Sequence, residues 1–196
     1  MNGMNRNRCA YPARRHAGRG VTLVEILVVM GIVGILMAIG IPSYKYVTNA
    51  NRISAEINGL LGDLQFARSE AIKEGQTVTV CISNDQSTCM AANTTTWDQG
   101  WIVYSDLNGN GTIDAGEILR AQKTFTGTDT FTANNTTTAA ISFNREGFAS
   151  VTNGTLITLH ASPAAQGSTR CLSVTVVGLV STMKYGAVDA GGNTCQ

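Results

Sequence analysis

The sequence predicts an α+β protein in which one long N-terminal helix is followed by a head of antiparallel β-strands. Residues 21–41 form an almost uninterrupted apolar run, and residues 42–75 repeat apolar side chains at three- and four-residue steps. Residues 76–196 contain short β-type runs separated by Gly, Asn, Asp and Ser. With 196 residues, of which 43% are hydrophobic and 14% charged, the chain is long enough to bury a core.

The apolar run from Val21 to Ile41 carries a single charge, at Glu25. As a helix it extends about 31 Å, against about 30 Å for the hydrocarbon core of a bilayer, and therefore predicts a membrane-spanning segment. Five arginines and no acid precede it in residues 1–20, while only Lys45 and Arg52 follow it closely. This asymmetry places the N-terminus in the cytoplasm and the body on the other side of the membrane.

Charge and histidine counts narrow the classes of function. Residues 1–20 carry five basic side chains, whereas the remaining 176 residues carry 9 basic and 13 acidic ones. A mildly acidic body argues against nonspecific coating of nucleic acid, which needs a positive surface. Only His16 and His160 are present, and no nucleophile elbow, P-loop or dinucleotide motif occurs. We therefore expect a protein that is not an enzyme.

A cleaved secretory signal is the alternative interpretation of the apolar run. Ala38-Ile39-Gly40 offers small residues at a plausible cleavage site, which would leave an exported globular binding protein that begins after Gly40. Glu25 argues against it. A carboxylate near the centre of an apolar helix costs on the order of 2.5–3.5 kcal/mol, less toward the interface, and such residues usually need a partner.

The segment Gly20-Val21-Thr22-Leu23-Val24-Glu25 resembles the type IV prepilin (class III) signal, in which Gly precedes the cut and Glu is fifth after it. Pro42 then lies at the twenty-second position of the processed chain, where pilin helices commonly bend. Val21 departs from the family, which usually has Phe or Met there. The resemblance implies that prepilin peptidase removes residues 1–20 and methylates the new amino terminus at Val21.

In such a processed chain the apolar helix is retained and becomes the core of a fibre. The resemblance implies that Val21 and Glu25 set the register of the subunits. The Glu25 carboxylate pairs with the free amine of an incoming subunit, an attraction that is strong and selective in a low-dielectric helix bundle.

The body is similar to the GspH/FimT group of minor pilins and pseudopilins. The similarity rests on three stretches: Phe66-Ala67-Arg68-Ser69-Glu70-Ala71-Ile72, Val78-Thr79-Val80-Cys81 and Ile141-Ser142-Phe143-Asn144-Arg145-Glu146-Gly147. It implies a type IV pilin-like fold and a minor pilin that works with other pilins. The chain would cross the inner membrane once, with its C-terminal domain in the periplasm, before it enters the pilus. A type II secretion pseudopilin is the first alternative.

The helix and strand patterns of the body can be placed by residue. Apolar residues predict an amphipathic helix that Gly75 ends, and they are Ile53, Ile57, Leu60, Leu61, Leu64, Ala67, Ala71 and Ile72. We expect close packing of a sheet at Gly59 and Gly62, and Arg68 and Glu70 on the solvated helix face. Strands are expected at 77–82, 101–104, 118–125, 140–143, 156–160 and 172–177. Thr at every even position from 124 to 132 predicts an edge strand or an ordered loop.

Four cysteines remain once the leader, with Cys9, is removed: Cys81, Cys89, Cys171 and Cys195. An even number in an exported domain predicts disulfides. Of the three possible pairings, Cys81 with Cys89 and Cys171 with Cys195 is favoured, because each closes a loop rich in turn residues. Metal binding by these cysteines is the minor alternative, since no CxxC spacing exists.

Residues 106–117 match the calcium-loop pattern D-x-[DN]-x-[DN]-G-x5-E at every specified position. The oxygen ligands would come from Asp106, Asn108, Asn110, the Thr112 carbonyl, Asp114 and Glu117. Strand-like sequence flanks the loop on both sides in place of the two helices of an EF-hand, so an ordinary hairpin loop is the alternative. No other cofactor is expected.

Nucleic-acid binding is the runner-up function. Some FimT-type proteins bind DNA through the arginines of a C-terminal GRxR motif, and the matching place here reads Gly178-Leu179-Val180-Ser181. Both arginines are missing, and only Arg170 and Lys184 supply positive charge nearby. The resemblance to DNA-binding members therefore lacks the residues that would carry the activity.

Overall fold

The computed structural model describes residues 20–135, 138–151, 154–162 and 168–196, apart from the side chains of Pro42 and Tyr46. Contacts divide the chain into two compact units, Met1–Tyr44 and Lys45–Gln196. Helix α1 (Leu23–Glu74) contributes to both units. The predicted leader, except Gly20, lies outside the described residues, and the bend predicted at Pro42 stays a prediction.

The second part of α1 is the amphipathic helix that the sequence predicts. Its side chains at steps of four and three residues are almost completely buried, and they are Ile53, Ile57, Leu60, Leu64, Ala67 and Ala71. The helix ends at Glu74 because Gly75 adopts φ +70°, and its N–H donates to the Ala71 carbonyl over 3.0 Å. This half of the helix therefore belongs to the core of the head.

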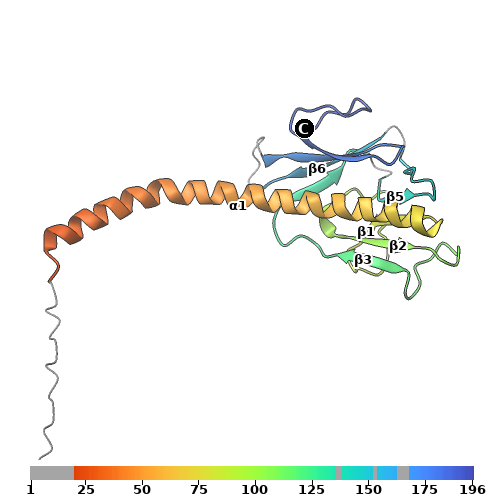
Figure 1. Cartoon of the computed structure of the whole chain (residues 1–196), viewed down its shortest axis with the longest axis horizontal. Helices are drawn as coiled ribbons and strands as arrows, with labels where there is room; N and C mark the ends of the chain where they lie inside the picture. Colours follow the sequence, from red (N-terminus) through yellow and green to blue (C-terminus); the bar gives the residue numbers. More distant parts are fainter. Residues whose placement is uncertain (1–19, 136–137, 152–153, 163–167) are drawn as a thin grey trace, which may run out of the picture. The chain divides into compact units, whose positions relative to one another are not determined.

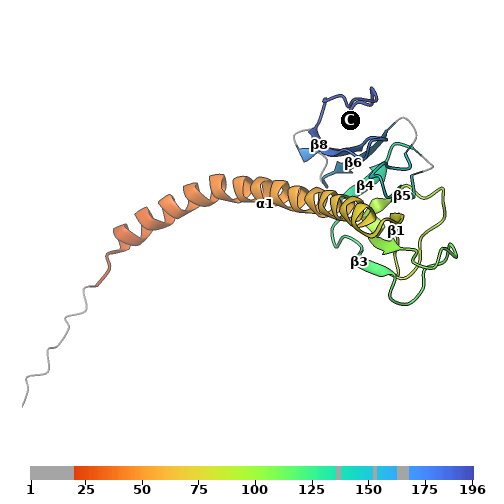
Figure 2. The same ribbon diagram turned by 45° about the vertical axis from the view of Figure 1, so that its right-hand side comes forward.

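The head contains two four-stranded antiparallel sheets. The first has the order β3-β2-β1-β5 and the second the order β4-β6-β7-β8. The strands are β1 (Val78–Ile82), β2 (Trp101–Ser105), β3 (Ile118–Gln122), β4 (Thr130–Ala133), β5 (Ala140–Phe143), β6 (Thr155–His160), β7 (Arg170–Val174) and β8 (Val180–Lys184). In Figure 1 the second part of α1 runs between β1, β2 and β3 on one side and β6 on the other, and Figure 2 shows the same order after rotation.

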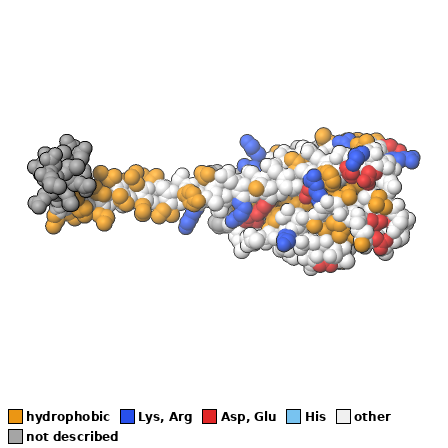
Figure 3. Space-filling view, turned by 60° about the horizontal axis from the view of Figure 1, so that its bottom comes forward, with side chains coloured by type: hydrophobic (Ala, Val, Ile, Leu, Met, Phe, Trp, Pro, Cys, Tyr) orange, Lys and Arg blue, Asp and Glu red, His pale blue; other side chains and the backbone are white. Residues whose placement is uncertain are grey.

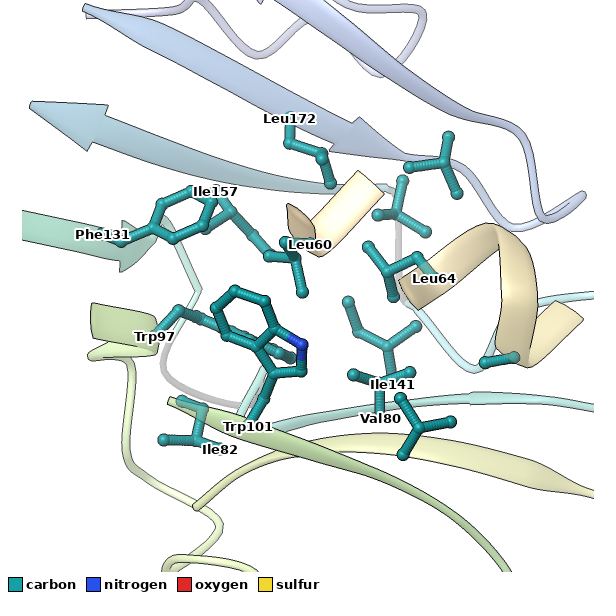
Figure 4. Close-up of a cluster of buried hydrophobic side chains, with 14 of the residues drawn as sticks. Leu60, Leu64, Val80, Ile82, Trp97, Trp101, Phe131, Ile141, Ile157 and Leu172 are labelled. Atoms are coloured by element: carbon teal, nitrogen blue, oxygen red, sulfur yellow. The ribbon is translucent and has the colours of Figure 1, made fainter. Parts of the chain in front are cut away.

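The core of the head combines α1 with the inner faces of both sheets. Figure 4 shows Leu60 and Leu64 of the helix between Val80 and Ile141 of the first sheet and Leu172 of the second. Several large side chains in this core are less than 2% exposed, and they include Trp97, Trp101, Phe131 and Ile157. One continuous apolar cluster thus joins three layers, and its burial is the main favourable term in the stability of the head.

Polar contacts tie the outer side of α1 to the first sheet. The Asp63 carboxylate accepts from the Trp101 indole N–H over 2.8 Å and from the Arg120 guanidinium over 2.9 Å. The Arg120 guanidinium also lies 3.8 Å above the centre of the Phe66 ring, a cation–π contact. Helix and sheet are therefore linked through charge as well as apolar packing.

Two disulfides brace the head, Cys81–Cys89 and Cys171–Cys195. They are the pairs that the sequence favours. The second ties the C-terminus to strand β7, and backbone bonds between Gly186 and Cys195 and between Cys195 and Ala187 close the C-terminal segment into a hairpin. The tail is therefore held onto the second sheet.

Several expectations differ from the structure. Strand β8 and the 3₁₀-helix η1 (Trp97–Gln99) were not predicted, and β3 ends at Gln122. The Thr-rich segment does supply an edge strand, β4. A Cβ at Gly59 would lie 4.0 Å from Trp101, but a Cβ at Gly62 would meet nothing within 4 Å. The prediction that a sheet packs closely at Gly62 is therefore wrong. Ile72 is 52% exposed because it does not lie on the buried apolar row of the helix.

Candidate functional site

The start of α1 is capped by Thr22. Its Oγ1 accepts a hydrogen bond from the Glu25 backbone N–H over 3.3 Å, and its carbonyl accepts one from Ile26 over 3.2 Å. Thr22-Leu23-Val24-Glu25 is the T-x-x-E spacing of a capping box, a signal that the sequence analysis missed. Cleavage after Gly20 would therefore leave a short amino terminus next to an ordered first helical turn.

Every residue from Gly20 to Ile41 is exposed. Figure 3 shows the apolar side chains along this segment, and α1 contains a stretch long and apolar enough to cross a membrane, none of it buried. Within the described residues no hydrogen bond or ion pair satisfies the Glu25 carboxylate. An uncovered apolar helix with an unpaired acid calls for lipid or other protein around it.

A cluster of charged side chains joins α1 to the loop before β4. Arg52 makes two hydrogen bonds to the fully buried Asp129 carboxylate, over 2.7 and 2.8 Å, and Ser162 N–H donates to the same carboxylate over 2.7 Å. Glu56 Oε1 lies 4.0 Å from Arg52 Nε, and the buried Glu56 Oε2 has no hydrogen-bond partner among the described residues. Burial raises the pKa of Glu56 to about 7, the nearby Asp129 charge adds to the shift, and Arg52 opposes it.

The acidic loop folds on hydrogen bonds of its own. Asp106 accepts from the N–H groups of Asn110 and Gly111, and Asp114 accepts from the side-chain amides of Asn108 and Asn110. Both Glu117 oxygens accept backbone N–H groups, those of Leu107 and Asp114.

These hydrogen bonds involve the side-chain oxygens that were predicted as calcium ligands. Among the described residues no three Asp, Glu, His or Cys side chains come together as a metal-binding group. The ligand set predicted from Asp106, Asn108, Asn110, Thr112, Asp114 and Glu117 is therefore not assembled in this arrangement, because amide and backbone donors face the carboxylates. Calcium binding by this loop stays a prediction.

The two cations considered for DNA binding, Arg170 and Lys184, lie on the β7–β8 hairpin. Arg170 of β7 is directly opposite Lys184 of β8, at the end of the hairpin away from the turn that contains Gly178. The turn itself lies against Arg68, whose Nη2 donates to the Val177 carbonyl over 3.2 Å. Arg68 is therefore not fully solvated, because its Nε is buried. Glu70 pairs with Lys73 over 2.7 Å, and its side chain is only 14% exposed, so it does not lie on a fully solvated face either.

A long helix with an uncovered apolar first part and a disulfide-braced β head on its second part defines a pilin-like protein. The family model of the type II transport protein GspH matches residues 56–179, and that of the prokaryotic N-terminal methylation motif matches residues 15–41. The chain belongs to the GspH family, which places it among the minor pilins and pseudopilins. The resemblance inferred from the leader and the body is thus confirmed.

Several individual proteins are similar to parts of the chain. Two fimbrial proteins of Pseudomonas aeruginosa are each 30% identical to the chain over 95 residues, which are 48% of this chain and 56% of theirs. The chain thus spans about half the length of the curated relatives it matches. Crystal structures of the type IV minor pilin FimU of P. aeruginosa PAO1 are similar at 20% identity, with TM-scores of 0.48 and 0.49; they cover 69% and 72% of this chain and 90% of FimU.

The Glu56 cluster predicts a stability that depends on pH. The pKa of Glu56 is raised from 4.5 to about 7 in the folded chain. The contribution of Glu56 to the free energy of unfolding is therefore fully present below about pH 4.5 and is lost as pH rises through about 7. We expect Glu56→Gln to flatten this decline in urea unfolding measured from about pH 5 to about pH 8. Glu146→Gln, at an exposed acid, is the control and should leave the decline in place; an unchanged decline in Glu56→Gln would contradict the prediction.

Calcium binding by the acidic loop can be tested by thermal unfolding. If residues 106–117 take calcium, the melting temperature of the full chain is higher in excess calcium than in excess chelator, because binding to the folded state alone stabilises it. Asp106→Asn should abolish that difference. Equal melting temperatures in the parent would show that the loop is held by its own hydrogen bonds.

Proposed function

We propose that this chain is a minor pilin that takes part in the assembly of a type IV pilus. The observation that carries the proposal is the exposed apolar segment 20–41 with one acid at its start, Glu25, which has no partner among the residues that the structure describes. Such a surface is stable only when it is covered, first by lipid and then by equivalent helices of neighbouring subunits. The chain acts by packing, without chemistry on a substrate.

The processing step is proposed from the methylation motif at residues 15–41. Prepilin peptidase cleaves between Gly20 and Val21 and methylates the amine of Val21. The cut leaves a positive charge four residues from Glu25, at the end of a helix whose first turn is ordered by Thr22. In a fibre the Glu25 carboxylate of one subunit then binds the amine of the next.

The location follows from the same features. The arginine-rich leader keeps the N-terminus in the cytoplasm, and the head is exported to the periplasm before the subunit leaves the inner membrane for the pilus. Disulfides in the head suit an oxidising compartment.

Two alternatives share this geometry. A type II secretion pseudopilin would assemble by the same helix packing, and the description of the family that matches the chain favours it as the second candidate. DNA binding in natural transformation depends here on Arg170 and Lys184, which stand side by side across two strands. Two cations at one place are few for a nucleic-acid surface, so the proposal does not include DNA.

The first test is the intact mass of the mature protein. We expect loss of residues 1–20 and gain of one methyl group, because cleavage precedes the apolar run. Loss of about forty residues would instead indicate a secretory signal and contradict the proposal. A strain without prepilin peptidase is the control, in which the full-length mass should persist.

The second test concerns Glu25. Glu25→Gln keeps the shape of the side chain and removes its charge, so the amine of a neighbouring subunit is left unpaired in an apolar bundle. We expect incorporation into purified filaments to fall by about tenfold or more, measured by quantitative mass spectrometry. Glu25→Asp retains the carboxylate and should incorporate measurably better than Glu25→Gln, and equal incorporation of parent and Glu25→Gln would rule out docking through this charge.

A further inference from the structure

An apolar patch lies where the end of α1 meets two turns of the head. It consists of Ile72, Phe148, Val176, Val177 and Leu179, which are 52%, 48%, 47%, 58% and 57% exposed. Turns usually carry Gly, Asn, Asp or Ser, so the sequence Val176-Val177-Gly178-Leu179 is an unusual composition for a β7–β8 turn. Exposed apolar side chains that gather in one place mark an interaction surface.

The backbone beneath the patch is closely packed. Gly147 and Gly178 have φ values of +81° and +75°, and a Cβ at Gly178 would lie 2.0 Å from the Gly147 carbonyl oxygen. The Ala149 N–H donates to the Val176 carbonyl over 2.9 Å, which joins the turn after β5 to the turn after β7. The patch is therefore presented on a fixed base, which reduces the entropy lost when a partner binds.

Arg68 lies in a groove of about 380 Å³ beside the patch, between α1 and the β7–β8 turn. Its Nη2 donates to the Val177 carbonyl, and its buried Nε has no hydrogen-bond partner in the described part of the chain. Arg68 forms no ion pair in the part of the chain that the structure describes, whereas Arg52 and Arg120 each face a carboxylate. A half-buried guanidinium without an acid is complementary to a negative group supplied from outside.

We propose that this patch and Arg68 form the docking site for the head of a neighbouring pilin-class subunit that presents an Asp or Glu beside apolar side chains. The acid pairs with the Arg68 guanidinium in the groove, and the apolar side chains cover Val177 and Leu179. Arginine is one of the residues most often found among those that contribute most of the binding energy at protein interfaces. The inference rests on the proposed function, because it places the partner in the same fibre.

Charges around the patch favour protein over other occupants. Glu70 and Glu146 stand beside Lys73 and Arg145 and pair with them, over 2.7 and 3.4 Å. The rim is therefore balanced in charge, and neither the phosphates of DNA nor an anionic membrane is attracted to it. One acidic side chain in an apolar segment matches Arg68, which has no ion pair among the described residues.

The test uses the full chain in cells that assemble the filament. Val177 is replaced by the photocrosslinking residue p-benzoylphenylalanine, and adducts are mapped by mass spectrometry in purified filaments. Lys184, at the other end of the same hairpin, is the control position. We expect an adduct from position 177 with a neighbouring subunit, at a peptide that contains an acid beside apolar residues, and about tenfold less adduct when Arg68→Glu is added.

A charge exchange completes the test. Replacing the acid of the mapped peptide by Arg should restore the adduct in the Arg68→Glu chain. Leu179→Ser, at an exposed position that cannot unfold the core, should also lower the adduct.

Each contrary outcome is distinct. An adduct with lipid or nucleic acid, no adduct from filaments that contain the chain, or an adduct insensitive to Arg68→Glu would overturn the docking site and leave the proposed function standing. Absence of the chain from filaments would overturn both.

Discussion

The head is organised by one row of side chains on helix α1, which both sheets cover at once. Leu60, Leu64, Ala67 and Ala71 have no exposed surface. Each four-stranded sheet needs a second layer over its apolar face, and the helix supplies the layer that they share. The two disulfides and the Asp63 contacts secure this arrangement at its margins.

The same helix has a first part with no such cover. From Val21 to Ile41 its apolar side chains are exposed. The head buries the apolar row of the second part of the helix, whereas the burial of the first part depends on other molecules. A soluble protein cannot keep such a surface in water. In the proposed function, retention of this segment is what makes the β head part of a larger assembly.

The sequence was informative where a pattern is local and periodic. The steps of three and four residues from Ile53 to Ala71 predict both the helix and its buried face, and Gly75 marks its end, because each depends only on neighbours along the chain. Strand β8 was missed because it is an edge strand in which only Val180 is buried, so it has no alternation to detect. The capping role of Thr22 was readable from its spacing to Glu25 and was overlooked.

The role of Arg68 is of another kind, because it is created by tertiary structure. Val177 and Gly178 lie more than a hundred residues later in the chain, and only folding places them against this guanidinium. Helical spacing by itself puts Arg68 on a surface beside Glu70. No pattern in one sequence reports which distant turn will cover a helix residue, and the same holds for Glu56 and Asp129.

Charged side chains on α1 differ in whether the described chain supplies a counter-charge. Arg52 has Asp129 and Glu56 within reach and completes the fold of the head, with one carboxyl group in excess. Glu25 and Arg68 have no counter-charge in the described chain. A folded domain gains nothing from an apolar setting around an unpaired charge, since desolvation costs free energy that no internal contact returns. The contacts proposed with other subunits would supply the missing counter-charges, a positive one for Glu25 and a negative one for Arg68.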